Sequence, residues 1–519
     1  MKKISFLMAA LLVAMVGCQK EPAANDAATA NGDAYMSFTI QTMTTRSQTD
    51  SEANQGDTPS DANPDFEVGK LAENQIKSVN VVLKNGTKFI CATNTAVAAD
   101  GQAPETAENP TRWVAKFNSS ELEAGVQYDV YVYANCTAQT SLDAKSSETI
   151  ANMTSSTGFW MTNAYAATKT NAIVLSNDEN NPFDLGTVYV ERSMARFDYK
   201  PKAAAGELAA NEYELSEDTK TTVTLTDMTL INQSKEFYYL RRTIGKNLTG
   251  DVTYGGSEIP DNYVVDTDWE AKKAASPLYS DLFDNALGSF TAAVSTWTDW
   301  KAISAIAVEN NKDNWTGTAT TDHAEDYYVW CYAKENTIPG TGLQLNGLST
   351  GVVFRGEISS KDADIQEDMT NKKTIYVFDN ILYGAWERVQ EAAKTTDNVT
   401  LKYYAELWST APLKEDAANA GFTTFAPTTD GKYYTYYYYW NRHNDNLQPT
   451  VMGDMEFAVV RNNVYKLCVD SIAKLGHPDE NGSDPDPVDP TDPDESGEYY
   501  FKVTAKVLPW VVRVNHIEF

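Results

Sequence analysis

The chain has 519 residues and a formal net charge of −30 at pH 7; 42% of its residues are hydrophobic and 11% aromatic. This length is enough for two or three domains with sizeable cores. The strong acidity argues against nucleic acid or an anionic lipid surface as a partner.

The first 18 residues predict an export signal. Lys2 and Lys3 provide a basic start, and residues 6–16 form an apolar run that is too short to span a bilayer. Residues 15–18, Met-Val-Gly-Cys, look like a lipobox, which implies that Cys18 is diacylated and becomes the first residue after signal removal. A plain signal peptide cut elsewhere is the alternative. No later apolar run is long enough to cross a membrane, so we expect the rest to be exported.

Residues 34–43 predict one strand, because Met36, Phe38 and Ile40 alternate with polar residues. The first arginine of the chain, Arg46, follows directly, and residues 48–65 are polar, acidic and contain Gly and Pro. An arginine between a strand and such a loop is an accessible protease site. An arginine that is merely solvated is the alternative interpretation.

The body of the chain predicts many short strands. Asn85-Gly86 between residues 78–84 and 87–92 is a strong hairpin signal. Further strands are predicted at residues 113–117, 128–135, 187–191, 196–199, 221–231, 327–333, 351–358 and 433–440. Helical patterns are scarce and are limited to residues 380–393 and 413–420. Short strands separated by turn signals indicate β-sandwiches.

Motifs for catalysis or for a cofactor are missing from the sequence. There is no P-loop, G-x-S-x-G, G-x-G-x-x-G or HExxH. His323 and Glu325 lie in an acidic stretch that could bind a metal, but a solvated loop is favoured because no other segment shares the ligand spacing. Acidic pairs are too numerous to single out a glycosidase dyad. We therefore expect no enzyme activity, no metal and no cofactor.

Five cysteines are scattered along the chain, and none lies in a CxxC motif that would favour a metal site. If Cys18 is lipidated, four remain, and they allow three disulfide pairings. Buried free thiols are at least as plausible for Cys91, Cys136, Cys331 and Cys468.

Residues 432–440, Lys-Tyr-Tyr-Thr-Tyr-Tyr-Tyr-Tyr-Trp, suggest a platform on which sugars could stack. The favoured interpretation is a strand with aromatics on both faces, one packed in the core and one on cross-strand neighbours.

The end of the chain combines a stiff tether with a strand pattern. Residues 477–497 contain an Asp-Pro run that cannot pack and that could extend on the order of 60 Å. Residues 499–508 then alternate as a strand, Pro509 is expected to break the ladder, and residues 510–519 form a second short strand. The apolar and aromatic positions of interest are Tyr499, Phe501, Val503, Val507 and Trp510. Such a pair could complete a sheet in another molecule, or fold back on its own domain.

Three regions together resemble a fimbrillin of the Bacteroidales type V pili, most closely the Mfa-type shaft subunit of the short (minor) fimbriae. The first is Ala34-Tyr-Met-Ser-Phe-Thr-Ile40 followed by Arg46, and the second is Val190-Glu-Arg-Ser-Met-Ala-Arg196. The third comprises Val459-Val-Arg-Asn-Asn-Val-Tyr465 and residues 471–476, which precede the tether and Val507-Leu-Pro-Trp510. The order and spacing of all three regions follow the family.

This resemblance implies a mainly β fold: two transthyretin-like β-sandwich domains with exchangeable N- and C-terminal strands. The implied divisions are a lipoprotein signal peptide (1–18), a propeptide with a removable first strand (19–46), the two sandwiches (47–190 and 191–476), the Asp/Pro tether (477–497) and the C-terminal donor strands (498–519).

The resemblance also implies a mechanism. The lipidated precursor reaches the outer membrane, an Arg-specific surface protease cuts between Arg46 and Ser47, and the strand carrying Met36, Phe38 and Ile40 leaves. The C-terminal strand of a neighbouring copy then fills the groove. The implied function is a fimbrium shaft subunit that supports cell adhesion and biofilm formation, with copies of itself and other anchor and tip subunits as partners. The alternatives are a surface glycan-binding lipoprotein and a fimbrial tip or anchor adhesin.

Overall fold

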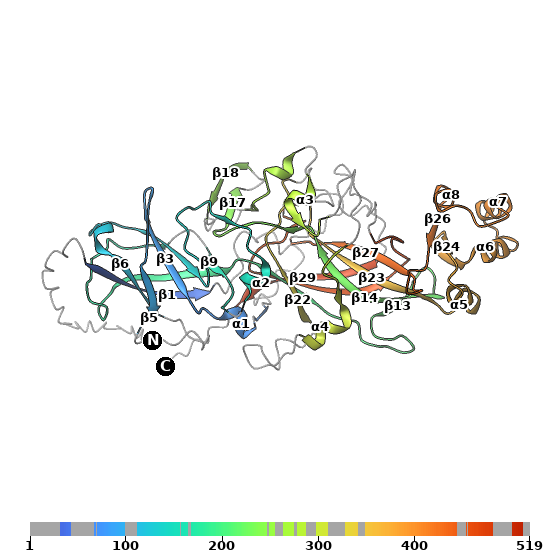
Figure 1. The fold of residues 1–519 in the computed structure, drawn as a ribbon, viewed down its shortest axis with the longest axis horizontal. Helices are drawn as coiled ribbons and strands as arrows, with labels where there is room; N and C mark the ends of the chain where they lie inside the picture. Colours follow the sequence, from blue (N-terminus) through green and yellow to red (C-terminus); the bar gives the residue numbers. More distant parts are fainter. Residues whose placement is uncertain are drawn as a thin grey trace, which may run out of the picture.

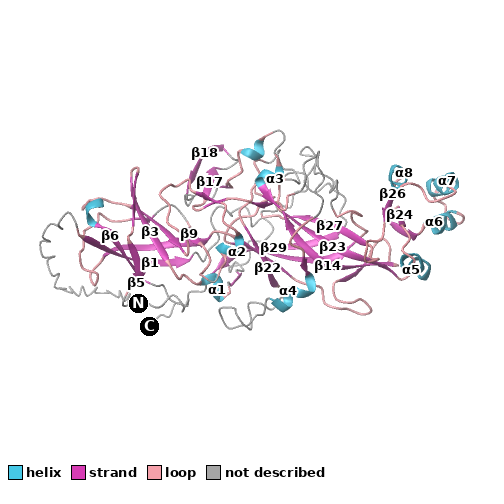
Figure 2. Cartoon of the chain, viewed as in Figure 1, coloured by secondary structure: helices cyan, strands magenta, loops and turns pink. Residues whose placement is uncertain are grey.

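In the computed structural model, strands lie at or near most of the predicted ranges, whereas β28 (Asn463–Ile472) and most of the short strands were not predicted. The structure describes residues 32–42, 67–68, 70–98, 112–155, 157–164, 168–245, 249–254, 263–274, 278–286, 297–309, 327–340, 348–443, 453, 455–480 and 501–511. Three regions follow one another along an elongated molecule: a first set of sheets, a second set, and a helical end (Figure 1). The predicted mainly β class is confirmed, and Figure 2 shows how strands dominate the first two regions.

The first region is a nine-stranded sheet with the order β4-β3-β7-β9-β11-β1-β6-β5, in which β10 pairs with β7. Its strands are β1 (Asp33–Thr42), β3 (Val79–Asn85), β4 (Lys88–Cys91), β5 (Asn94–Val97), β6 (Arg112–Asn118), β7 (Asp129–Ala134), β9 (Met161–Asn163), β10 (Thr168–Lys169) and β11 (Phe183–Arg192). The predicted hairpin is confirmed as β3 and β4, and Gly86 has the positive φ of 57° that its turn requires.

The second region is a sandwich of two five-stranded sheets. One has the order β2-β29-β28-β12-β22, and the other has the order β13-β14-β23-β27 with β21 paired to β14. Their strands are β2 (Glu67–Val68), β12 (Ala195–Tyr199), β13 (Glu212–Glu214), β14 (Thr221–Ile231), β21 (Lys301–Ala302), β22 (Tyr328–Ala333), β23 (Gly351–Ser360), β27 (Tyr434–Trp440), β28 (Asn463–Ile472) and β29 (Phe501–Val511). Residues of both sheets, among them Phe197, Phe354 and Tyr465, share one hydrophobic core.

Short strands and helices accompany the main sheets of these two regions. The short sheets contain β8 (Lys145–Ser146), β15 (Gln233–Ser234), β16 (Phe237–Tyr238), β17 (Arg242–Gly245), β18 (Thr249–Tyr254), β19 (Tyr263–Val264) and β20 (Phe283–Asp284). The short helices are α1 (Leu71–Asn74), α2 (Ile150–Met153), α3 (Tyr279–Leu282) and α4 (Ile303–Glu309).

In the helical end, the helix predicted at residues 380–393 is shorter than expected. The elements of this end are α5 (Ala363–Thr370), β24 (Ile375–Phe378), β25 (Ile381–Gly384), α6 (Trp386–Ala393), α7 (Val399–Leu407), α8 (Lys414–Asn419) and β26 (Phe422–Phe425). Asp379 and Asn380 adopt positive φ and turn the chain from β24 into β25, so the helix begins only at Trp386. The predicted helix at residues 413–420 is confirmed as α8, whereas α5 and α7 were not predicted.

The predicted break at Pro509 is wrong, because one strand, β29, runs through Pro509. Residues 512–519 of the predicted second strand lie outside the described residues. Pro509 lies opposite Asn463, the first residue of β28, while pairing with β2 begins only at Trp510. The proline therefore falls where one ladder ends and the next begins, and its missing N–H interrupts neither.

Among the described residues, no helix is long and apolar enough to cross a membrane.

Candidate assembly site

The strand β1 lies inside the nine-stranded sheet, with a partner along each edge (Figure 1). It runs parallel to β11, with Ile40 opposite Val188, and antiparallel to β6, with Phe38 opposite Trp113. Both rows of backbone hydrogen-bonding groups are therefore in use. If β1 were removed, two strands that are now interior would each present an unpaired edge.

The apolar face of β1 lies in the hydrophobic core. Met36 and Phe38 have no exposed surface and Ile40 is 4% exposed, in one cluster with residues of β6 and β11. Burying a side chain of this size stabilises the fold by about 1.5–3 kcal/mol, so the three together contribute roughly 5–9 kcal/mol. The structure thus brings together the three residues predicted for the displaced strand.

The polar contacts of β1 contribute less to its stability than the burial of its apolar side chains. The Ser37 hydroxyl is buried and accepts a hydrogen bond of 3.1 Å from Arg112 Nη2. Asp33 forms an ion pair of 2.7 Å with Lys116, but both side chains are exposed, and such pairs contribute little. Packing rather than charge holds this strand.

The C-terminal strand β29 occupies a different position. It is antiparallel to β28 over the full length of that strand, and, within the described residues, two of its residues also pair with β2. By register, Phe501 lies opposite Ile472, Val503 opposite Val469, Val507 opposite Tyr465 and Trp510 opposite Glu67. Tyr499 lies outside the described residues. In the isolated chain, the predicted donor strand therefore rests on its own domain.

The predicted processing sites lie outside the described residues, namely Cys18, Arg46 and Ser47. Their order along the chain still constrains their role. β1 ends at Thr42 and the next strand, β2, begins at Glu67, so a cut after Arg46 falls in the connection between them. Such a cut would leave no covalent link between β1 and the rest of the sheet.

Directly after β2, helix α1 carries a buried carboxylate. Glu73 accepts a hydrogen bond of 2.5 Å from the Tyr332 hydroxyl and one of 2.5 Å from the backbone N–H of Lys70. It also forms an ion pair of 2.9 Å with Arg196. Arg196 in turn donates two hydrogen bonds of 2.8 Å to Asp198. This cluster links the segment after the predicted cut to the sheet that holds β29.

Arg192 extends the same cluster. Its Nε donates to the backbone oxygen of Glu73 at 2.9 Å, and its other nitrogens donate to Asn74 and Asn462. Arg192 is 1% exposed. Because β11 ends at Arg192 and β12 begins at Ala195, these contacts lie where the chain passes from the first set of sheets to the second.

Glu191 and Arg461 complete the buried charges of this junction. Glu191 pairs with Arg241, whose Nε donates at 2.9 Å, and Arg461 pairs with Glu335 at 2.6 Å. Burial raises the pKa of Glu191, against the opposing effect of the nearby Arg241 and Arg461 guanidinium groups. Removing one partner from such a pair leaves a buried charge uncompensated, which costs about 3–5 kcal/mol.

Three of these buried charges lie within residues 190–196, the segment that carries part of the family resemblance. Sequence reasoning recognised the segment only by resemblance and assigned no role to Glu191, Arg192 or Arg196. The only signal in the sequence was that three charged residues lie close together in two neighbouring strands. Charged residues in a buried strand would need partners, because charges are rarely buried unless they are paired.

The tyrosine-rich segment packs as a strand. Tyr433 and Tyr437 are buried, and their hydroxyls donate to the backbone oxygens of Lys373 at 2.6 Å and Lys474 at 3.2 Å. Tyr436 packs on the opposite face in a second aromatic cluster with Trp297. The favoured interpretation of this segment, with aromatics packed on both faces of a strand, is confirmed.

Four cysteines are described, and each is a free thiol: Cys91, Cys136, Cys331 and Cys468. Burial raises the pKa of all four thiols. The described part of the chain has no group of three or more His, Cys, Asp or Glu side chains that could hold a metal ion. His323 and Glu325 lie outside it.

One known protein family matches the C-terminal part of the chain. Residues 431–516 match the family described as major fimbrial subunit protein type IV, fimbrillin, C-terminal. This match spans β27, β28 and β29 and confirms the expected resemblance to fimbrillins for that region. No curated protein sequence matches the chain.

Several solved structures can be aligned with most of the chain at low identity. A fimbrilin (FimA) from Porphyromonas gingivalis shares 13% identity, with 93% of this chain and 99% of that chain covered and a TM-score of 0.39. A protein from Parabacteroides distasonis assigned to cell adhesion shares 14% identity, with 94% and 100% covered and a TM-score of 0.41. The tip fimbrial protein Mfa3 from Porphyromonas gingivalis shares 8% identity, with 92% and 100% covered and a TM-score of 0.33.

Proposed function

We propose that this chain, whose residues 431–516 match the fimbrillin C-terminal family, is a fimbrium shaft subunit that polymerises by exchange of its terminal strands. The observation that carries this proposal is the position of β1. This strand is paired on both edges and buried on its apolar face, yet it precedes the connection that contains Arg46.

Before cleavage, the connection holds β1 at high effective concentration and keeps its slot filled. After a cut between Arg46 and Ser47, β1 is held by noncovalent contacts alone. Once it leaves, β6 and β11 border an apolar slot that only another strand can satisfy.

The donor is β29 of a neighbouring copy. It lies at the end of the chain, after the Asp/Pro tether at residues 477–497, and its outer edge pairs with only two residues of β2. Insertion of one copy into the next does not close on itself, so the product is a filament. Copies of this chain are therefore its main partners, with anchor and tip subunits at the filament ends.

The precursor is a lipoprotein anchored in the outer membrane through Cys18, and an Arg-specific surface protease releases it. The mature subunit then resides in the fimbrium on the cell surface and supports adhesion and biofilm formation. We assign no catalytic role to this chain.

The test is processing of the purified precursor by an Arg-specific protease. Wild-type protein should give mature chains that begin at Ser47 and filaments that are visible by electron microscopy, whereas Arg46→Ala should retain β1 and stay unpolymerised. Arg388→Ala, in the helical end, is the matched control and should polymerise. Filaments whose subunits still contain residues 34–40 would refute the proposal.

A further inference from the structure

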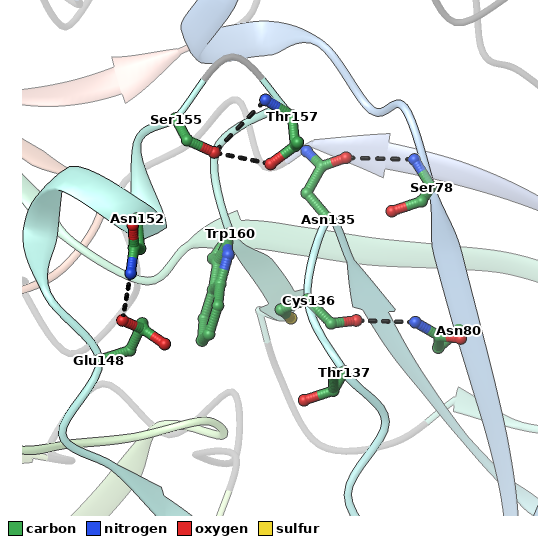
Figure 3. Close-up of a pocket in the computed structure, with 10 residues that line it drawn as sticks. All are labelled: Ser78, Asn80, Asn135, Cys136, Thr137, Glu148, Asn152, Ser155, Thr157 and Trp160. Atoms are coloured by element: carbon green, nitrogen blue, oxygen red, sulfur yellow. Dashed lines mark hydrogen bonds between the residues drawn. The ribbon is translucent and has the colours of Figure 1, made fainter.

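A polar depression of about 440 Å³ opens on the first region, away from β1 (Figure 3). One indole, Trp160, lies among hydroxyl and amide side chains such as Asn80, Thr137 and Asn152, and Glu148 contributes the carboxylate. Its volume lies within the range of small-molecule sites, but its lining is more polar than is usual for them.

One wall of the depression is rigid. Asn135 has a φ of 59°, and its side-chain amide donates hydrogen bonds of 2.8 Å to the backbone oxygens of Gln75 and Phe159. Its oxygen accepts from the backbone N–H of Ser78 at 3.2 Å. Gly158 is required beside it, because a Cβ there would lie 2.3 Å from Asn135 Nδ2. A site that is already ordered loses less entropy when a ligand binds.

The indole of Trp160 is also held in place. It stacks on Tyr239 with ring centroids 5.8 Å apart and an interplanar angle of 18°. Its backbone N–H donates to Met153 at 3.0 Å, and its backbone oxygen accepts from Ser193 at 2.9 Å. Trp160 is only partly buried, and Figure 3 shows its ring standing between Glu148 and Asn152 on one side and Cys136 on the other.

Glu148 determines which charge the depression accepts. Its Oε1 accepts hydrogen bonds from Asn152 Nδ2 at 2.6 Å and from the backbone N–H of Thr149 at 3.0 Å. These bonds hold the pKa of Glu148 below its usual value, so the carboxylate is charged at neutral pH. An anionic ligand would be repelled, particularly on a chain with a net charge of −30.

We propose that this depression binds a neutral sugar. A sugar ring offers C–H groups to an indole face and hydroxyls to amides, hydroxyls and a carboxylate, which are the groups that line the site. A cationic side chain could also contact the indole and Glu148. The neutral sugar is favoured, because one carboxylate stands among many uncharged amide and hydroxyl groups. This inference does not depend on polymerisation, since the depression forms without β29.

The test uses the unprocessed protein and two sets of probes: methyl glycosides of neutral hexoses and N-acetylhexosamines, and Nα-acetyl-lysine methyl ester. Binding is measured by saturation-transfer NMR and calorimetry. We expect at least one neutral glycoside to bind wild-type protein, and we expect Glu148→Gln and Trp160→Leu each to weaken that binding at least tenfold. Glu121→Gln, an exposed carboxylate of the same region, is the matched control and should bind like wild type.

Glu148 is partly exposed and belongs to no hydrophobic cluster, so we expect Glu148→Gln to fold and to keep the test decisive even if Trp160→Leu is unstable. Three outcomes overturn the inference: no neutral glycoside binds, Glu148→Gln binds as tightly as the control, or only the lysine ester binds.

Discussion

The two terminal strands, β1 and β29, are held in opposite ways. β1 has a neighbour along both edges and buries Met36, Phe38 and Ile40 in the core. In the described part of the chain, β29 has one full-length neighbour, β28, and two residues of β2 on its other side. Removal of β1 therefore opens a slot in the middle of a sheet, whereas removal of β29 uncovers one edge. This difference suits β1 to be the strand that is replaced and β29 to be the strand that is donated.

The two strands also differ in how they are covalently joined to the rest of the chain. β1 is joined to its sheet through the connection that contains Arg46, while β29 follows a tether rich in Asp and Pro. The proposed cleavage would change only the first connection. It would make a tightly packed strand exchangeable by lowering its effective concentration.

The largest expected effect comes from truncating the apolar face of β1. In an Arg46→Ala precursor, Phe38→Ala should lower the free energy of unfolding by about 3–5 kcal/mol, because it leaves a cavity in the core. Urea denaturation measures this loss. Thr39→Ala, half-buried on the other face of the same strand, is the control and should cost less. Filaments made from cleaved Phe38→Ala protein should be as stable as wild type, since β1 has left; equal destabilisation of both would contradict the exchange.

Deleting residues 498–519 should have a smaller effect on stability. β28 keeps its partner β12, so we expect the truncated precursor to unfold cooperatively and to lose less stability than Phe38→Ala. After cleavage, however, it should form no filaments, because no donor strand remains. Thermal melts and electron microscopy of the same sample report the two properties. Loss of cooperative unfolding would show instead that β29 is an essential part of its own domain.

The smallest effect is expected in the helical end, far from both strands. The Asp368 carboxylate accepts a hydrogen bond of 3.0 Å from the Ala385 N–H and contacts Lys373 at 3.2 Å and Arg388 at 3.3 Å. Burial opposes ionisation, but these partners outweigh it and lower the pKa of Asp368. Its contribution to stability is thus present above the unfolded-state pKa of about 3.9 and is lost as the pH falls through the lower folded-state value.

Asp368→Asn should therefore reduce stability at neutral pH and weaken the decline of stability in acid, as thermal melts between pH 7 and pH 2.5 would show. Filament formation should not change. A variant that folds but no longer polymerises would show that the helical end takes part in assembly. Assembly would then not depend on the two terminal strands alone.

The sequence by itself determined many of the longer strands, although it missed β28. The period-2 pattern placed β14 at residues 221–231, and Asn85-Gly86 located the β3–β4 turn, because side-chain alternation and positive φ are local properties. The same local logic identified the apolar face of β1. The sequence pattern did not predict short helices such as α7, because a helix that buries only Leu401 and Ala405 has little apolar periodicity.

Only the tertiary structure decided which strands are neighbours and which charges are buried. Alternation fixes the faces of β1 but cannot say that β11 and β6 lie beside it, since any strand can pair with any other through its backbone. The sequence does not show that Glu191, Arg192 and Arg196 are buried. They are buried because partners from distant segments, including Glu73 and Arg241, offset the cost of desolvation. Pro509 lies inside β29 for the same reason: the ladders that meet there belong to other parts of the chain.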